Sequence, residues 1–257
     1  MTGSLSFDRA AEYYDATRVT DPATLGSIVR LLGEHVAGEG PVLEIGVGTG
    51  QLAMPFAATG VRVTGLDLSS AMMEKLIEKS GGISPIPLVL GDATAMPFGD
   101  RVFVGAYARW VLHLISAWQT VLRELDRVVA GDGAIAIEPG GESGVFRDVF
   151  LRFHGILGDV ALPPGLHPVR RGEQLDEAMG EIGWRLDHVE ALEYAAQVPL
   201  ATFFDEIPDR RFSWTWNVPG DALAAATGEV RAWAAERFDL DAPQPAVATR
   251  WRVYRRV

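Results

Sequence analysis

The chain contains no cysteine, which excludes every class of protein that depends on this residue. With no cysteine among 257 residues, it can have no disulfide framework, no thiolate-ligated zinc or iron–sulfur site and no thiol nucleophile. Long hydrophobic runs are also missing, since no apolar stretch approaches the roughly 18 residues of a membrane-spanning helix. The first seven residues lack the charged and apolar regions of a signal peptide. We therefore expect a cytoplasmic protein with no membrane partner.

Positive charge is scarce as well. The chain has 34 acidic and 23 basic side chains, for a net charge of −11. A broad basic face, which binds the phosphates of nucleic acids or of anionic lipids, is therefore not expected. The hydrophobic content of 48% is ordinary for a globular protein. The length suits one α/β domain with an elaboration, at about 100–200 residues per domain.

The first half of the chain alternates short apolar runs with helical patterns. Runs typical of buried strands lie at 41–45, 61–66, 86–90, 102–107 and 134–137. Helical patterns lie at 7–18, from Pro22 after the cap residue Asp21, at 49–59, after Ser69 or Ser70, and at 118–129. This alternation predicts a parallel sheet with helices on both faces, whose ligands bind beyond the carboxyl ends of the strands.

The second half is less regular. Helices are expected at 145–157, 171–182 and 221–238, with β-like stretches at 185–198 and 247–253. Aromatic residues gather between them: Phe203, Phe204, Phe212, Trp214 and Trp216. These side chains either fill a core or form an apolar lid over a small ligand, and the sequence leaves both interpretations open.

The strongest local signal is a glycine-rich turn directly after the first expected strand. Gly46, Gly48 and Gly50 follow the strand, and Glu44 lies at its end. Glycine permits a tight turn and a close approach of the backbone to a ligand. The dinucleotide fingerprint G-x-G-x-x-G would need a glycine where the chain has Gln51. The turn thus indicates a nucleotide-like ligand, with a nicotinamide-dependent oxidoreductase as the less favoured alternative.

Acidic residues follow the next two expected strands. Asp67 ends the second strand, where a carboxylate can bind both hydroxyls of a ribose. Asp92 follows the third strand, where a carboxylate beside a backbone N–H can contact the amino edge of an adenine. The two acids together favour an adenosine ligand.

These segments resemble the class I S-adenosylmethionine-dependent methyltransferases, in particular the small-molecule, methyltransferase type 11-like branch. The motifs that carry the resemblance lie at 43–50, 65–69, 91–93, 96–98, 108–113 and 122–133, and it covers about residues 7–138. It implies a Rossmann-like, doubly wound, mostly parallel seven-stranded sheet. One departure is that Val104 and Gly105 supply no acid near the start of the fourth strand.

We accordingly expect a single domain over residues 1–257. Residues 1–138 would form the cofactor-binding half, and residues 139–257 would supply the last two strands and a helical substrate cap. The oligomeric state is left open.

The resemblance also implies which residues bind S-adenosylmethionine. For its methionine part and sulfonium, it points to Glu44, Gly46, Gly48, Gly50, Ala108 and Arg109, with Tyr14 and Arg18 closing over the cofactor. Arg18 would pair with the methionine carboxylate. For the adenosine part, it points to Asp67 at the ribose, Leu68 and Met72 beside the adenine, and Asp92 and Ala93 at its edge.

The expected chemistry requires little of the protein beyond alignment of the reactants. The donor carries an activated methyl group, so the protein mainly orients the acceptor and excludes water. A general base helps only if the acceptor loses a proton. His113 and His167 are candidate bases, although each could equally be a structural histidine.

No metal site is predicted, because the histidines do not recur at i, i+4 and lack clustered acids. The sequence therefore predicts methyl transfer to a small, apolar or aromatic acceptor, with no nucleic-acid partner. A cofactor-binding module without catalysis is a further alternative.

Overall fold

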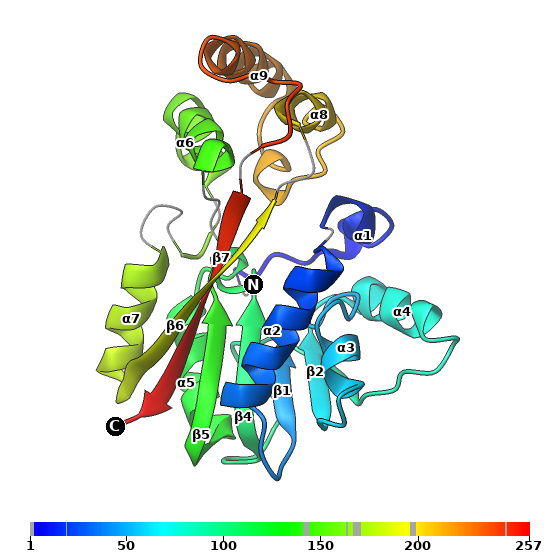
Figure 1. Ribbon diagram of the computed structural model, residues 1–257, viewed down its shortest axis with the longest axis vertical. Helices are drawn as coiled ribbons and strands as arrows, with labels where there is room; N and C mark the ends of the chain where they lie inside the picture. The colour runs from blue at the N-terminus through cyan, green and yellow to red at the C-terminus, as the bar shows by residue number, and fades with distance from the viewer. Residues whose placement is uncertain are drawn as a thin grey trace.

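The computed structural model describes residues 3–18, 20–140, 144–162, 164–166, 171–195, 199–244 and 246–257. Its centre is a seven-stranded sheet in the order β3-β2-β1-β4-β5-β7-β6 (Figure 1). The strands are β1 (Val42–Ile45), β2 (Val63–Asp67), β3 (Leu88–Leu90), β4 (Phe103–Arg109), β5 (Val129–Glu138), β6 (Trp184–Ala195) and β7 (Ala246–Arg256). The mostly parallel sheet expected from the sequence is confirmed.

Helices lie before, between and after the strands. They are α1 (Tyr14–Thr17), α2 (Pro22–His35), α3 (Ala53–Ala57), α4 (Ser70–Lys79), α5 (Trp118–Val128), α6 (Gly144–Leu157), α7 (Arg171–Glu181), α8 (Leu200–Glu206) and α9 (Gly220–Ala235). Four 3-10 helices are also described: η1 (Asp8–Ala10), η2 (Leu112–Leu114), η3 (Gly158–Ala161) and η4 (Ser213–Thr215). The predicted caps are confirmed, since Asp21 accepts a hydrogen bond from the Thr24 amide of α2 at 3.0 Å and Ser69 accepts one from the Met72 amide of α4 at 3.1 Å.

The five strands β1 to β5 are parallel, whereas β7 runs antiparallel to both β5 and β6. The carboxyl ends of β1, β2 and β4 therefore meet at one edge of the sheet. The strand order reverses between β1 and β4, which places a crevice beyond these ends.

Alternating side chains give the sheet two buried faces. Leu43 and Ile45 of β1 face the core beneath α5 and α7, whereas Val42 faces the core beneath α2, α3 and α4. A third apolar cluster is built from α6, α8, α9 and η3. In Figure 1 these helices stand above the carboxyl edge of the sheet, and we call them the cap.

Three predicted elements differ from the structure. The helix expected at 7–18 is two short turns, η1 and α1, because Asp8 and Asp15 bond to other elements. The helix expected at 49–59 is only Ala53–Ala57, since Gly50 adopts φ +79°. The strand expected at 134–137 is longer, since β5 already begins at Val129, and a Cβ on Gly133 would lie 2.5 Å from the carbonyl oxygen of Val104.

Across the described ranges, no helix combines the length and the apolar character needed to cross a bilayer.

Candidate active site

The glycine turn after β1 has the geometry that its sequence predicts. Gly46, Gly48 and Gly50 have φ values of +70°, +54° and +79°, in the left-handed region that side-chain-bearing residues avoid. Space is also limited, because a Cβ on Gly46 would lie 2.3 Å from Cγ2 of Val111. The turn thus needs glycine for its conformation and leaves its backbone free to approach a ligand.

Glu44 lies at the base of this turn and is only 4% exposed. Its carboxylate accepts a hydrogen bond of 2.8 Å from the hydroxyl of Tyr107 on β4. Burial raises the pKa of Glu44 to about 8, although the bond from Tyr107 opposes the shift. Glu44 is therefore an acid that is mostly protonated at neutral pH and can become a carboxylate beside a positively charged ligand.

Asp67 at the end of β2 supports the turn from the other side. It accepts hydrogen bonds from the backbone N–H of Gly48 at 2.7 Å and of Ser69 at 2.9 Å. Burial raises its pKa, and these two bonds counteract the rise. Its carboxylate lies at the end of β2, against the glycine turn, and its role as a ribose ligand stays a prediction.

The residues expected around the adenine have different environments. Leu68 is 36% exposed, whereas Met72 is 3% exposed and lies under the glycine turn. Asp92 accepts two hydrogen bonds from Thr94, through the backbone N–H at 2.9 Å and the hydroxyl at 2.8 Å. Ala93 is buried in the core under α5 and α7. Leu68 is thus the side chain of this group that is open to a ligand.

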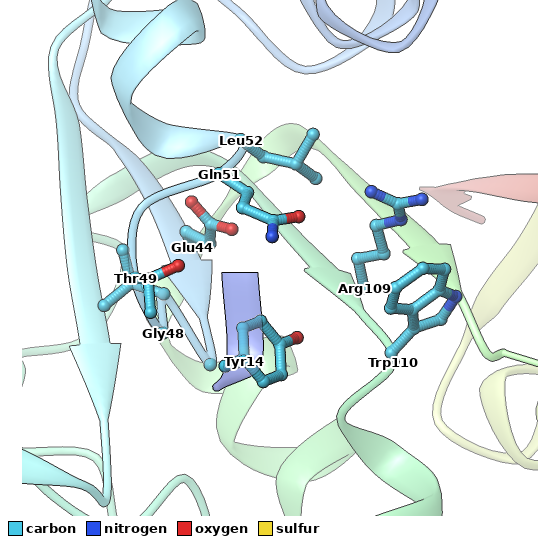
Figure 2. A pocket seen from close by; sticks show the side chains of 10 residues that line it. Tyr14, Glu44, Gly48, Thr49, Gln51, Leu52, Arg109 and Trp110 are labelled. Carbon is cyan, nitrogen blue, oxygen red and sulfur yellow. The ribbon is translucent and has the colours of Figure 1, made fainter. Parts of the chain in front are cut away.

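A pocket opens between the glycine turn and the end of β4. It is lined by Tyr14, Glu44, Gly46, Val47, Gly48, Thr49, Gln51, Leu52, Arg109 and Trp110. Figure 2 shows Tyr14, Gln51 and Arg109 around its mouth, with Glu44 behind them. Ala108, the neighbour of Arg109, is 1% exposed and lies in the core.

Arg109 is the main cation of this pocket. Its Nη1 donates to Thr20 at 3.0 Å, and its guanidinium lies 3.9 Å from the ring centroid of Trp110. Its Nε and Nη2 are buried and have no hydrogen-bond partner among the described residues. Trp110 itself has φ +57°, a strained conformation for a bulky residue. Two unpartnered donors of a buried guanidinium form a site suited to a carboxylate.

The N-terminal segment, residues 3–18, is fastened to the glycine turn by a contact that the sequence did not reveal. Asp15 accepts hydrogen bonds from the hydroxyl of Thr49 at 2.5 Å, from the amide of Gln51 at 3.1 Å and from Lys79 at 2.7 Å. Partial burial tends to raise the pKa of Asp15, but these bonds outweigh it and leave the pKa below its ordinary value. Since the partners lie more than 30 positions away, no local pattern could have indicated them.

Tyr14 and Arg18 lie on this segment, as expected, but they face different neighbours. Tyr14 lines the pocket and packs edge-on against Phe7, with the ring centroids 6.0 Å apart. The ring of Phe7 in turn packs against that of Trp216, with the centroids 5.0 Å apart. Desolvation raises the pKa of Tyr14 despite the nearby Arg18 and Arg109. Arg18 lies 5.1 Å from the ring of Phe212. The segment therefore joins the pocket to the cap.

The aromatic residues of 200–216 were expected either to fill a core or to form a lid over a ligand, and they do not all behave alike. Phe203 and Phe204 are buried in the apolar cluster of the cap, which confirms the core interpretation for these two. Phe212 and Trp214 pack against the cluster from outside, and Trp216 contacts Phe7 of the N-terminal segment. The lid interpretation thus remains open for the last three.

His113 lies on η2, just beyond the end of β4. Its Nδ1 is buried and lacks a hydrogen-bond partner within the described part of the chain. Burial lowers its pKa well below the ordinary value, and the charges of Arg171 and Arg18 act in the same direction. These effects all disfavour the positively charged form of the His113 imidazole. His167, the other predicted base, lies outside the described residues.

Glu138 ends β5, two residues before Gly140, where a Cβ would lie 3.6 Å from Nδ1 of His113. It is 3% exposed, and one of its oxygens accepts a hydrogen bond from the backbone of Gly140 at 3.2 Å. Burial raises its pKa to about 7, against the influence of Arg109 and Arg171. Two buried carboxyls, Glu44 and Glu138, thus flank the guanidinium of Arg109.

A glycine turn, an acid at the end of β2 and a pocket at the β1–β4 switch point are features of a Rossmann-like fold that binds a nucleotide-like ligand. The comparison with known families agrees, since residues 43–137 match the methyltransferase domain. Residues 43–137 are therefore similar to a methyltransferase domain, a class of domain whose methyl donor is S-adenosylmethionine.

Relatives with assigned names support this domain. The chain is 34% identical over 96 residues to a malonyl-acyl-carrier-protein O-methyltransferase of Legionella pneumophila, covering 37% of this chain and 34% of that protein. It is 25% identical over 203 residues to the enzyme of the same name from Geobacter sulfurreducens, covering 76% of this chain and 75% of that protein. The chain thus spans about a third of the first relative and three quarters of the second.

Solved structures share the fold. A phosphoethanolamine N-methyltransferase of Haemonchus contortus, solved with phosphomonomethylethanolamine and S-adenosylhomocysteine, superimposes with a TM-score of 0.60. The alignment covers 97% of this chain and 57% of the other, at 15% identity. This likeness shows the fold alone.

Proposed function

We propose that this protein transfers a methyl group from S-adenosylmethionine to a small acceptor with an apolar or aromatic body. The supporting observation is the pocket in which the glycine turn, Glu44 and Arg109 meet. When bound, the cofactor would supply an activated methyl group on a sulfonium. The protein would contribute orientation and the exclusion of water.

The residues at the pocket fit the charges of an amino acid moiety. Glu44, as a carboxylate, would bind the ammonium, and the backbone of Gly46, Gly48 and Gly50 would lie against it. The free donors of Arg109 suit the carboxylate, whereas Arg18 lies over Phe212 towards the cap. We therefore assign the carboxylate to Arg109 rather than to Arg18. Asp67 would hold the ribose hydroxyls, beside Leu68.

Matched variants test this assignment. Arg109→Gln should weaken the binding of S-adenosylhomocysteine by about tenfold to a hundredfold, as expected for a lost charge-assisted pair worth about 1.5–3 kcal/mol. Arg18→Gln should change it less than threefold. The reverse order in isothermal titration calorimetry would return the carboxylate to Arg18.

The acceptor would lie between the end of β4 and the cap. Phe212 and Trp216 line the side of the cap that faces the N-terminal segment, which favours an apolar or aromatic acceptor. His113 would be the candidate base through its unpartnered Nδ1, and its lowered pKa would suit it only to an acceptor whose proton is already acidic. The residues of 139–257 would thus determine the acceptor, as a helical substrate cap.

The first experiment is calorimetric titration with S-adenosylmethionine and S-adenosylhomocysteine. Asp67→Asn should weaken binding strongly, whereas Asp132→Asn on the exposed part of β5 makes the same chemical change without effect. Absence of binding by the wild-type protein at near-millimolar ligand would refute the proposal.

The acceptor needs an untargeted search. The protein is incubated with isotopically labelled S-adenosylmethionine and a cell extract, and labelled small molecules are identified by mass spectrometry. Label should appear in a new small molecule with wild-type protein and not with Asp67→Asn. Cofactor binding without any turnover across diverse extracts would favour a non-catalytic binding module instead.

A further inference from the structure

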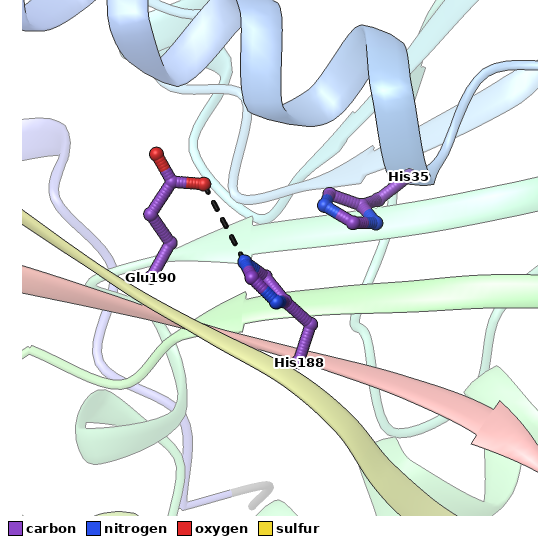
Figure 3. Close-up of side chains that lie close together, drawn as sticks. All are labelled: His35, His188 and Glu190. Carbon is purple, nitrogen blue, oxygen red and sulfur yellow. Dashed lines mark ion pairs between the residues drawn. The ribbon is translucent and has the colours of Figure 1, made fainter.

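Two histidines and a glutamate from distant parts of the chain meet at the edge of the sheet. His35 is the last residue of α2, and His188 and Glu190 lie on the edge strand β6. One ligand atom from each residue lies within 4.8 Å of the other two. Figure 3 shows the three side chains converging in the space between the end of α2 and β6. This His–His–Glu cluster has no part in the proposed methyl-transfer site.

The local structure explains why the three side chains converge. Residues two apart on a strand point to the same face, so His188 and Glu190 both point towards α2. The pairing of β6 with β7 shifts its register between Leu186 and His188. A bulge of this kind re-aims the side chains that follow it. His35 precedes His188 by 153 residues, so no local sequence pattern could indicate that the two side chains lie together.

The contacts inside the cluster are close but incomplete. The two imidazole rings are stacked, with centroids 4.8 Å apart and an interplanar angle of 22°. Nε2 of His188 lies 3.6 Å from Oε2 of Glu190, beyond hydrogen-bonding distance. Within the described ranges, no hydrogen bond joins the three side chains. They are half-buried, so that a fourth position is open to water.

The charges around the cluster also favour a cation. His35 stands in the last turn of α2, where the partial negative charge of a helix C-terminus favours positive charge. One guanidinium lies beside the cluster: Arg255 donates to the backbone oxygen of His35 at 3.3 Å and to the carboxylate of Asp187 at 3.2 Å, and the Asp187 carboxylate balances its charge.

We propose that His35, His188 and Glu190 bind a divalent transition-metal ion, with Zn²⁺ as the best match. Imidazole nitrogens with one carboxylate suit Zn²⁺, Ni²⁺ and Cu²⁺, and three protein ligands with one water complete a tetrahedral zinc site. To bind one ion, the two imidazole rings would turn out of their stacked arrangement, because the lone pair of each ring nitrogen lies in the plane of its ring. The bound ion would tie the C-terminus of α2 to β6, at the end of α2 that precedes β1 and away from the pocket beyond the end of β1. The sequence alone predicts no metal site, so this proposal differs from that prediction.

Calorimetric titration of the chelator-treated full chain with ZnCl₂ tests the proposal. Wild-type protein should bind one equivalent, and its melting temperature should rise with the concentration of Zn²⁺ because the ion binds only the folded state. His188→Ala and His35→Ala should each lower the affinity at least tenfold. Glu190→Gln, which keeps the shape of the side chain, should lower the affinity for Zn²⁺ by a smaller factor. This variant tests the site even if an alanine variant does not fold.

Asp187→Asn is the matched control, because it removes a neighbouring negative charge without removing a ligand. Its affinity for Zn²⁺ should stay within threefold of wild type. Binding of S-adenosylhomocysteine should be the same with and without Zn²⁺, so that failure of the metal site leaves the proposed function untouched. Weak binding of several equivalents that His188→Ala leaves unchanged would overturn the proposal and identify adventitious zinc only. An unchanged melting temperature in Zn²⁺ would do the same.

Discussion

The cofactor half, up to Glu138, and the cap that follows it are stabilised by different kinds of contact. Around the glycine turn, hydrogen bonds of defined geometry hold the site, such as Tyr107 to Glu44 at 2.8 Å and Gly48 to Asp67 at 2.7 Å. The cap is held by an apolar cluster of side chains from α6, α8, α9 and η3. Apolar packing tolerates exchange of similar side chains, whereas the geometry of the turn does not. Under the proposed function, the cofactor half would hold S-adenosylmethionine with fixed geometry, and the apolar cap would be the part that can change with the acceptor.

The largest expected effects come from one buried phenylalanine in each region. Phe56 is fully buried and packs edge-on against Tyr107 at 5.6 Å, and Phe204 is 1% exposed in the cap. Either Phe→Ala change should lower the free energy of unfolding by about 3–5 kcal/mol through the cavity that it leaves. Urea denaturation followed by circular dichroism measures this loss.

The two variants should differ in ligand binding. Phe56→Ala loosens Tyr107, which positions Glu44, so the folded protein should bind S-adenosylhomocysteine about tenfold more weakly, or about 1.4 kcal/mol. Phe204→Ala should leave this affinity within twofold, since Phe204 belongs to the cap cluster, whose described members include no residue of the glycine turn. An equal loss in both variants would show that the cap belongs to the cofactor site.

The next effect is a pH dependence that is confined to the cofactor half. Burial raises the pKa of Glu44 to about 8, so the free protein holds a proton there at pH 7. An ammonium group favours the carboxylate, and binding therefore releases this proton. Affinity for S-adenosylhomocysteine should rise by up to about tenfold per pH unit between pH 6 and 8 and then level off. Glu44→Gln should abolish this slope in calorimetric titrations.

The carboxyl group of Glu44 should make the stability of the fold depend on pH in the opposite direction to the ligand affinity. The pKa of Glu44 in the folded state lies above its ordinary value of 4.5, so the folded protein binds one more proton than the unfolded chain between the two values. Stability from this group is therefore present at low pH and is lost as the pH rises towards 8. An unchanged pH dependence of urea unfolding in Glu44→Gln would show that another group is responsible.

The same division explains which features the sequence could predict. The sequence indicates Gly46, Gly48 and Asp67 because each belongs to a local pattern. A left-handed turn requires glycine, and the acid directly follows an apolar strand. The Asp15 contact with Thr49 was missed, because it joins residues 34 positions apart. Asp15 also accounts for the wrong helix at 7–18, since its tertiary contacts replace a continuous helix. In the cap, apolar spacing predicted the helices but carried no chemistry from which an acceptor could be inferred.

A smaller effect should follow from loosening the N-terminal segment. Asp15→Asn removes the charge that accepts bonds from Thr49, Gln51 and Lys79. S-adenosylhomocysteine should then bind about threefold to tenfold more weakly, in line with a loss of about 1 kcal/mol, and dissociate faster. Glu12→Gln is the control on the same segment, because its exposed ion pair with Lys75 contributes little. Equal effects of both variants in stopped-flow measurements would mean that the segment acts through its net charge.

The smallest expected effect concerns two exposed helical glycines, one in each region. Gly26 in α2 and Gly228 in α9 have open space where a Cβ would stand, and neither has a positive φ. Each Gly→Ala change should therefore raise the free energy of unfolding by about 0.5–1 kcal/mol, because alanine loses less backbone entropy in a helix. Affinity for S-adenosylhomocysteine should not change in either variant. Equal gains would show that helix energetics are the same in both regions and that only the site distinguishes them. A gain in stability at Gly228 accompanied by slower turnover would instead reveal that α9 must move for the cap to admit its acceptor.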